Sequence, residues 1–143
     1  MEDRGAAKTG TAGFIGLGMM GTPMAMNLQR GGHPLCVYGR RAESMRPLVA
    51  AGARPCASPK EVARGADCTF IMVSGQSEAE AAIFGQEGVL AGIAPGSTVV
   101  LMSTVSPDCA RALAGRLKAK GGEMLDAPVS GAAQEAIDGS LSI

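Results

Sequence analysis

Three glycines, Gly16, Gly18 and Gly21, form the pattern G-x-G-x-x-G within the stretch GFIGLGMMG. An apolar stretch precedes them and a helical pattern follows, which is the strand, turn and helix order that a dinucleotide-binding site requires. In that order Gly16 makes a tight turn, Gly18 lets the backbone approach a pyrophosphate, and Gly21 lets the helix pack closely on the strand. The pattern therefore predicts a phosphate-binding turn; the alternative is a tight strand-to-helix turn that binds no ligand.

Two backbone amides complete this predicted phosphate site. Met19 and Met20 stand at the start of the helix that follows the turn. Amides at a helix N-terminus point outward, and the helix dipole there favours an anion. The chain has no G-K-[ST] sequence, so a P-loop is excluded.

Two arginines, Arg40 and Arg41, follow the second expected strand in the stretch VYGRR. An NAD-binding domain normally has an acidic residue there, about 20 residues beyond the glycines, to hold the ribose 2′-hydroxyl. Guanidinium groups instead suit a 2′-phosphate, because they offer forked donors and a permanent charge. The sequence thus favours NADP, with NAD as the second choice. Two alternatives stay open: a pair of solvated arginines opening a helix, and an S-adenosylmethionine site, which the missing acid disfavours.

The elements that must position these residues alternate along the chain. Short apolar stretches are typical of strands buried on both faces, and helices between them imply a parallel sheet with right-handed crossovers. We therefore predict an α/β fold of the Rossmann type: a doubly wound, mainly parallel sheet with helices on both faces. We expect residues 1–12 to be a flexible lead-in and residues 13–143 to form the NAD(P)-binding domain. The predicted strands are 12–17, 35–38, 53–56, 68–73, 98–102 and 124–125; the predicted helices are 20–30, 42–51, one starting at Pro59, 78–84 and one from Pro107 to the glycines at 121 and 122; a helical turn and the start of a strand follow in 132–143.

Composition narrows the class of protein. The 143 residues carry 13 basic and 13 acidic side chains, 46% apolar residues and 3% aromatic residues, so a buried core is expected and binding to nucleic acid or a membrane surface is not. No apolar stretch is long enough to span a membrane, and the first ten residues do not read as a secretory signal, so the expected location is the cytoplasm. The one histidine, His33, is a turn residue, and no metal site is expected because the cysteines lack ligand spacing. We expect free, mostly buried thiols at Cys36, Cys56, Cys68 and Cys109.

Three further stretches make the sequence more specific: FIMVSGQ after the fourth strand, STVSP after the fifth and DAPVSG after the sixth. Together with GLGMMGTPMAMNL they resemble the β-hydroxyacid dehydrogenase family over residues 13–143. The resemblance implies that Val73 and Ser74 lie along the adenosine and ribose, that Thr104 contacts the nicotinamide ribose, and that Ser130 and Gly131 bind the substrate carboxylate through a hydroxyl and backbone amides. On its residues alone, P-V-S-G reads as a turn.

The sequence departs from that family at two positions. Ala132 follows Gly131 where a second glycine is usual, and Gly39 stands where the family often has Asn. The first change is expected to narrow the substrate loop, and the second to loosen the loop on the adenine side.

The family's catalytic lysine lies well beyond DAPVSG, so we expect it beyond Ile143; Lys60, Lys118 and Lys120 do not match it. The resemblance then implies the cofactor-binding half of an oxidoreductase that transfers hydride between NADP(H) and a small 3-hydroxy acid or semialdehyde carboxylate. This cofactor-binding half is expected to be inactive alone, and the parent protein is expected to be a homo-oligomer through its helical C-terminal domain. The alternative is a non-catalytic, dehydrogenase-like scaffold or regulatory module.

Overall fold

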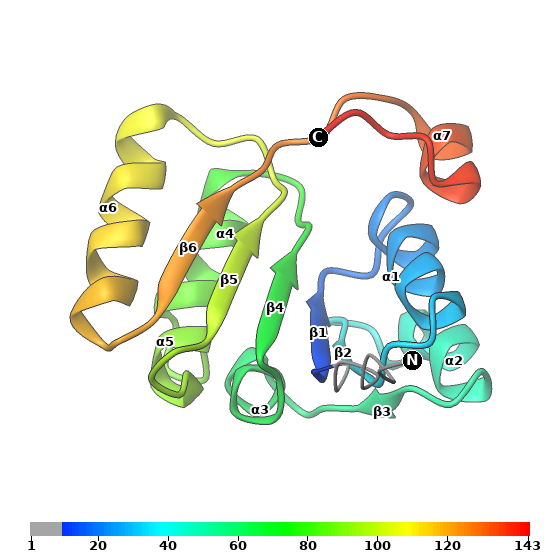
Figure 1. The fold of residues 1–143 in the computed structure, drawn as a ribbon, viewed down its shortest axis with the longest axis horizontal. Helices are drawn as coiled ribbons and strands as arrows, with labels where there is room; N and C mark the ends of the chain where they lie inside the picture. The colour runs from blue at the N-terminus through cyan, green and yellow to red at the C-terminus, as the bar shows by residue number, and fades with distance from the viewer. Residues whose placement is uncertain (1–9) are drawn as a thin grey trace, which may run out of the picture.

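A computed structural model describes residues 10–143, so most of the predicted lead-in lies outside the described residues. Its centre is one six-stranded sheet in the order β3-β2-β1-β4-β5-β6, with every neighbouring pair parallel (Figure 1). This is the doubly wound Rossmann order, and it confirms the predicted fold class. The strands are β1 Ala12–Ile15, β2 Leu35–Tyr38, β3 Arg54–Pro55, β4 Cys68–Ile71, β5 Thr98–Leu101 and β6 Glu123–Asp126.

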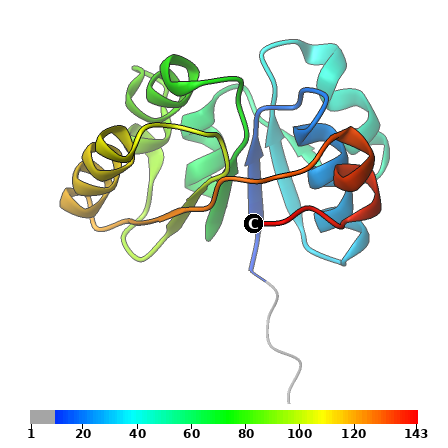
Figure 2. The same ribbon diagram turned by 90° about the horizontal axis from the view of Figure 1, so that it is seen from above.

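Helices cover both faces of the sheet, as the view from above shows (Figure 2). Because the chain crosses over in one direction from β1 to β3 and in the other from β4 to β6, right-handed crossovers place the two sets of helices on opposite faces. One face carries α1 Gly21–Arg30, α2 Ala42–Ala50 and α7 Ala133–Asp138; the other carries α3 Pro59–Gly65, α4 Gln76–Phe84, α5 Val89–Gly92 and α6 Pro107–Ala119.

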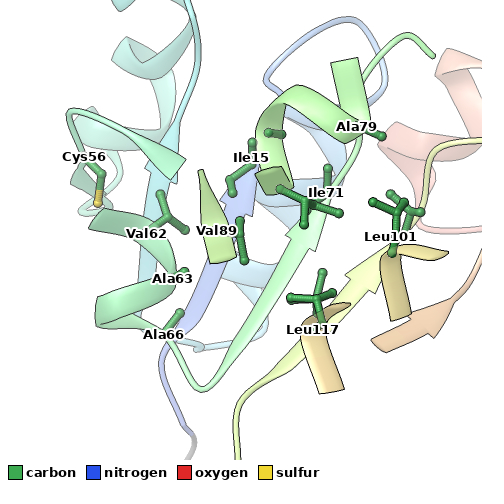
Figure 3. Packing of buried hydrophobic residues seen from close by; sticks show 14 of the residues in the cluster. Ile15, Cys56, Val62, Ala63, Ala66, Ile71, Ala79, Val89, Leu101 and Leu117 are labelled. Atoms are coloured by element: carbon green, nitrogen blue, oxygen red, sulfur yellow. The ribbon is translucent and has the colours of Figure 1, made fainter. Parts of the chain in front are cut away.

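Each face of the sheet has its own apolar core. Successive strand residues point to opposite faces, so Phe14 belongs to the cluster under α1 and α2 while Ile15 belongs to the cluster under α3 to α6. Figure 3 shows the second cluster, in which Ile15 and Ile71 from the sheet meet Val62 from α3 and Val89 from α5. The inner strands β1, β2, β4 and β5 are therefore packed on both sides, as their uninterrupted apolar character predicted, whereas the edge strands β3 and β6 are largely exposed.

Two helices begin directly after a serine cap, Ser58 before α3 and Ser106 before α6. The Ser58 hydroxyl accepts a hydrogen bond from the Glu61 amide at 3.2 Å, and the Ser106 hydroxyl accepts one from the Cys109 amide at 3.2 Å. In both helices a proline occupies the first position, where its missing N–H leaves no partner unsatisfied.

Several boundaries differ from the sequence-based predictions. The first strand ends at Ile15 instead of Leu17, because Gly16 has a φ of +97° and turns the chain out of the sheet. The glycine-rich connection after Phe84 contains the short helix α5, which was not predicted. The strand expected near the C-terminus is a single antiparallel bridge between Ser130 and Ser142. Among residues 10–143, no helix combines the length and apolarity needed to cross a membrane.

Candidate nucleotide-binding site

A cavity of about 900 Å³ opens at the carboxyl ends of β1, β2 and β4. Ligands of open parallel sheets bind at this edge, where the direction of the strand order reverses between β1 and β4. The glycine turn, the end of β2 and the segment after β4 all line the cavity. The predicted cofactor residues among its walls are Gly16, Gly18, Met19, Met20, Gly21, Arg40, Arg41, Val73 and Ser74.

The three glycines occupy three different environments. A Cβ on Gly16 would overlap the carbonyl oxygen of Met72, and one on Gly21 would overlap the carbonyl oxygen of Gly16 and lie 3.2 Å from the Phe14 ring. A Cβ on Gly18 would meet no atom within 4 Å. The turn is thus tight at Gly16, closely packed at Gly21, and open to an approaching ligand at Gly18. The tight turn at Gly16 and the close packing at Gly21 agree with the prediction, and the approach of a pyrophosphate to Gly18 stays a prediction.

The amides of Met19 and Met20 have no protein acceptor within the described residues. The helix ladder of α1 begins after them, with the Thr22 amide donating to the Gly18 oxygen at 3.1 Å. The first amides of a helix are unpaired unless a cap or a ligand accepts from them, and no side chain caps α1. The geometry therefore leaves donors suited to an anion at the mouth of the cavity.

The arginine pair stands exposed on the cavity wall beyond β2. None of the three ion pairs among residues 10–143 involves Arg40 or Arg41, so both guanidinium groups keep their donors for another anion. Gly39 beside them is buried, and the Ser44 hydroxyl, which donates to the Arg41 oxygen at 2.7 Å, occupies the space that a Cβ on Gly39 would need. The loop expected to be looser at Gly39 is therefore closely packed.

The other predicted site residues lie further along the same edge of the sheet. Thr104 is exposed beyond β5, and Ser130 and Gly131 lie beyond β6; none of the three lines the cavity. The Ser130 amide donates to the Ser142 oxygen at 2.8 Å, so it is not available to a carboxylate as expected. The Ser130 hydroxyl and the Gly131 amide remain as donors, and their role stays a prediction.

Sequence reasoning missed the far wall of the cavity. This wall comes from the start of α3, from α4 and from the connection between α4 and α5. No motif marks these residues, because only the folding of α3 and α4 against the sheet brings them opposite the arginine pair. They are Pro59, Glu78, Ala81, Ala82, Gly85, Glu87 and Gly88, and Tyr38 and Ser44 extend the near wall.

All four cysteines are free thiols; Cys36, Cys56 and Cys109 are buried and Cys68 is partly buried, as predicted. Burial raises the pKa of the Cys56 thiol to about 11, and the neighbouring Cys36 adds to the shift. Burial likewise raises the pKa of Cys36 and of Cys68. These thiols are protonated at neutral pH and are therefore poor nucleophiles and poor metal ligands. Within residues 10–143, no group of three histidine, cysteine or acidic side chains is arranged to hold a metal.

The sequence of residues 11–143 matches the family described as the NAD binding domain of 6-phosphogluconate dehydrogenase. The chain belongs to this family. Among curated relatives, this NAD-binding domain is 43% identical over 131 residues to the cytokine-like nuclear factor N-PAC of Homo sapiens and 40% identical over 128 residues to the 3-sulfolactaldehyde reductase of Escherichia coli. These alignments cover 92% and 90% of the NAD-binding domain.

Solved structures place the NAD-binding domain among oxidoreductases. The 3-hydroxyisobutyrate dehydrogenase of Salmonella typhimurium superposes with a TM-score of 0.86 at 34% identity, and a structure of Psf3 in complex with NADP+ superposes with a TM-score of 0.86 at 30% identity. Each alignment covers 92% of the NAD-binding domain and 46% of the other chain. These likenesses identify it as an N-terminal domain of the β-hydroxyacid dehydrogenase type. The chain spans 24% of the nuclear factor and 43% of the sulfolactaldehyde reductase.

Proposed function

We propose that this NAD-binding domain binds NADP(H) for an oxidoreductase that acts on a small 3-hydroxy acid or a semialdehyde carboxylate. The observation that carries the proposal is the pair Arg40 and Arg41, which line the cavity without an ion-pair partner among residues 10–143. An acid at the end of β2 would favour NAD by accepting from the ribose hydroxyls, but the residues there are Tyr38 and Gly39. The two guanidinium groups are suited to a 2′-phosphate.

The substrate class is supported by the family and by the loop after β6. The relatives are named for 3-sulfolactaldehyde and 3-hydroxyisobutyrate, small molecules that carry an acid group beside an aldehyde or a hydroxyl. The Ser130 hydroxyl and the Gly131 amide would hold the carboxylate at the edge of the sheet where the cofactor cavity opens. The cofactor supplies the hydride, while the protein supplies position and electrostatics. We expect the proton-transferring lysine outside this chain, so the chain alone would bind cofactor without turnover.

Cofactor choice is tested by titrating the chain with NADPH and NADH. We expect NADPH to bind at least about tenfold more tightly, since charge-assisted bonds to a phosphate contribute about 1.5–3 kcal/mol each. Replacing both arginines by alanine should remove this preference and leave NADH binding unchanged. Arg46→Ala is the matched control, because Arg46 is an exposed arginine of α2 that does not line the cavity. Tighter binding of NADH by the wild-type chain would contradict the proposal.

A non-catalytic nucleotide-binding module is the second candidate, and the 43% identity to a protein named as a nuclear factor favours it. Both candidates predict cofactor binding, so the substrate loop must discriminate between them. With NADP+ bound, a dehydrogenase domain should bind 3-hydroxyisobutyrate and shift the amide resonance of Gly131. A module without substrate should show no such shift at millimolar carboxylate.

A further inference from the structure

The segment after β4 that lines the cavity, Met72 to Ser74, is held by a residue that does not line the cavity. Ser103 follows β5, does not line the cavity, and is only 1% exposed. Its hydroxyl oxygen accepts a hydrogen bond from the Val73 amide at 2.8 Å, from a residue 30 positions earlier in the chain. Val73 does line the cavity.

This bond extends the pairing of β4 with β5 beyond the end of both strands. The last backbone bond between them runs from the Met102 amide to the Ile71 oxygen at 2.9 Å. The Met72 amide faces the other way and donates to the Ile15 oxygen at 2.9 Å. Amides alternate along a strand, so the Val73 amide faces β5 again, and there it meets a serine hydroxyl in place of a backbone carbonyl.

The peptide that Ser103 holds is the one against which the glycine turn packs. A Cβ on Gly16 would overlap the Met72 oxygen and would lie 2.9 Å from a Val73 methyl group. Gly16 therefore rests directly on the Met72–Val73 peptide, with no side chain between the two backbones. A displacement of that peptide would move the floor of the phosphate-binding turn and the Val73 wall together.

We infer that Ser103 is a positioning residue of the nucleotide site: its hydroxyl holds the Met72–Val73 peptide where it supports the Gly16 turn. The inference rests on the proposed binding of NADP(H). It assigns a function to the first residue of the S-T-V-S-P stretch that differs from the cofactor contact predicted for its neighbour Thr104. Without the hydroxyl, the Val73 amide would lose its acceptor on the side that faces Ser103, which is only 1% exposed.

The test compares Ser103→Ala with Ser97→Ala, its matched control. Ser97 is also buried, at 8% exposure, but it precedes β5 at the opposite end of the strand. We expect Ser103→Ala to weaken NADPH binding about tenfold, as expected for a lost bond that leaves a donor unpaired. Ser97→Ala should bind NADPH within about twofold of the wild-type chain even if its melting temperature falls. Free-energy effects at distant sites are usually independent, so a loss of stability at Ser97 should not carry over to the cavity. Equal affinities of Ser103→Ala and the wild-type chain would overturn the inference.

Two measurements keep the test decisive. Ser103→Cys preserves the shape of the side chain with a weak acceptor, so it should lose less affinity than Ser103→Ala and can replace that variant if it does not fold.

Amide hydrogen exchange without cofactor reports positioning directly, through the Gly16 amide, which donates to the Tyr38 oxygen at 3.1 Å. Faster exchange at both Val73 and Gly16 supports the inference; faster exchange at Val73 alone overturns it. A wild-type chain that binds no NADPH would refute the proposed function, and the exchange result would still decide the role of Ser103.

Discussion

One residue type does three different things in the phosphate-binding turn. Gly16 is needed for its φ of +97°, and Gly21 for the close approach of α1 to the chain that precedes it. Gly18 has neither constraint, because it has no positive φ and its missing side chain would project into open space. Its absence of a side chain matters only if a ligand occupies that space.

This distinction predicts that Gly18→Ala and Gly21→Ala fail in opposite ways. Gly18→Ala should change the free energy of unfolding by less than about 0.5 kcal/mol but weaken NADPH binding at least about tenfold, because the methyl group would occupy the phosphate position. Gly21→Ala should lower the free energy of unfolding by about 1–3 kcal/mol through overpacking. Urea unfolding and NADPH titration of each variant measure the two effects.

Gly115→Ala is the control, since Gly115 lies inside α6 with no atom within 4 Å of its would-be Cβ. That variant should be more stable by about 0.5–1 kcal/mol and should bind NADPH normally. A loss of stability in Gly18→Ala as large as that in Gly21→Ala would show that a Cβ at position 18 meets other atoms of the protein.

At the scale of single residues, a feature could be predicted from the sequence when it follows from the residue type alone. The place of the glycines and the arginines at the cavity could be predicted, because backbone freedom and a permanent charge are properties of single residues. The packing of the Ser44 hydroxyl over Gly39 could not, because it depends on a side chain bonding to a backbone oxygen three residues earlier. The hydrogen bond from the Ser130 amide to the Ser142 oxygen could not be predicted either, because α7 must first fold to bring the two serines together.

At the scale of elements, α1 contacts different partners at its two ends. Its N-terminus faces the cavity, while Asn27 in a later turn holds α7. The Asn27 side-chain amide donates to the Ala136 oxygen at 2.8 Å and to the Ile137 oxygen at 3.4 Å. A helix of six residues is not stable alone, so α7 depends on such tertiary contacts.

We therefore predict that Asn27→Ala loosens α7 and the bridge that follows it. The variant should lose about 1 kcal/mol of unfolding free energy, the usual net contribution of an intramolecular hydrogen bond. Hydrogen exchange should accelerate across residues 133–142 and remain unchanged in β1 and β4. Gln134→Ala is the control, because within residues 10–143 its side chain bonds only to Asp138, on the exposed face of α7. Unchanged exchange in α7 of the Asn27 variant would contradict this view.

Strands and long helices were predictable because they must bury an apolar face with a fixed period. The short helix α5 was not, since its four residues include Gly92 and give no periodicity. Gly92 is nevertheless required there, because a Cβ would overlap the Lys60 oxygen of α3. The strand expected after α7 shrank to one bridge, because Gly139, with a φ of +73°, turns the chain back toward Ser130.

At the scale of the whole molecule, the two apolar clusters share one sheet, and the cavity draws its walls from both sides of it. The glycine turn and the arginine pair belong to the side of α1 and α2, whereas Pro59, Ala82 and Gly88 belong to the side of α3 to α5. Phe14 and Phe70 stack across β1 and β4 with ring centroids 6.1 Å apart, so the two halves of the sheet are also packed to each other. The molecule should therefore unfold as one unit.

Leu48→Ala and Ile83→Ala test this coupling from opposite faces. Both side chains are fully buried, Leu48 in the cluster under α1 and α2 and Ile83 in the cluster under α3 to α6. Each variant should lose about 2–5 kcal/mol, yet far-UV circular dichroism and Tyr38 fluorescence should report the same single transition. Val49→Ala, at a 39% exposed position of α2, should lie within about 0.5 kcal/mol of the wild-type chain.

Binding of NADPH should then stabilise both core variants by the same amount. At a free concentration of 100 Kd, a ligand that binds only the folded chain adds about 2.7 kcal/mol, whichever face was weakened. A cavity walled from both faces can form only when both clusters are folded, which makes the rescue independent of the site of damage. Two separate transitions, or rescue of Leu48→Ala but not of Ile83→Ala, would mean that one half of the sheet folds and binds without the other.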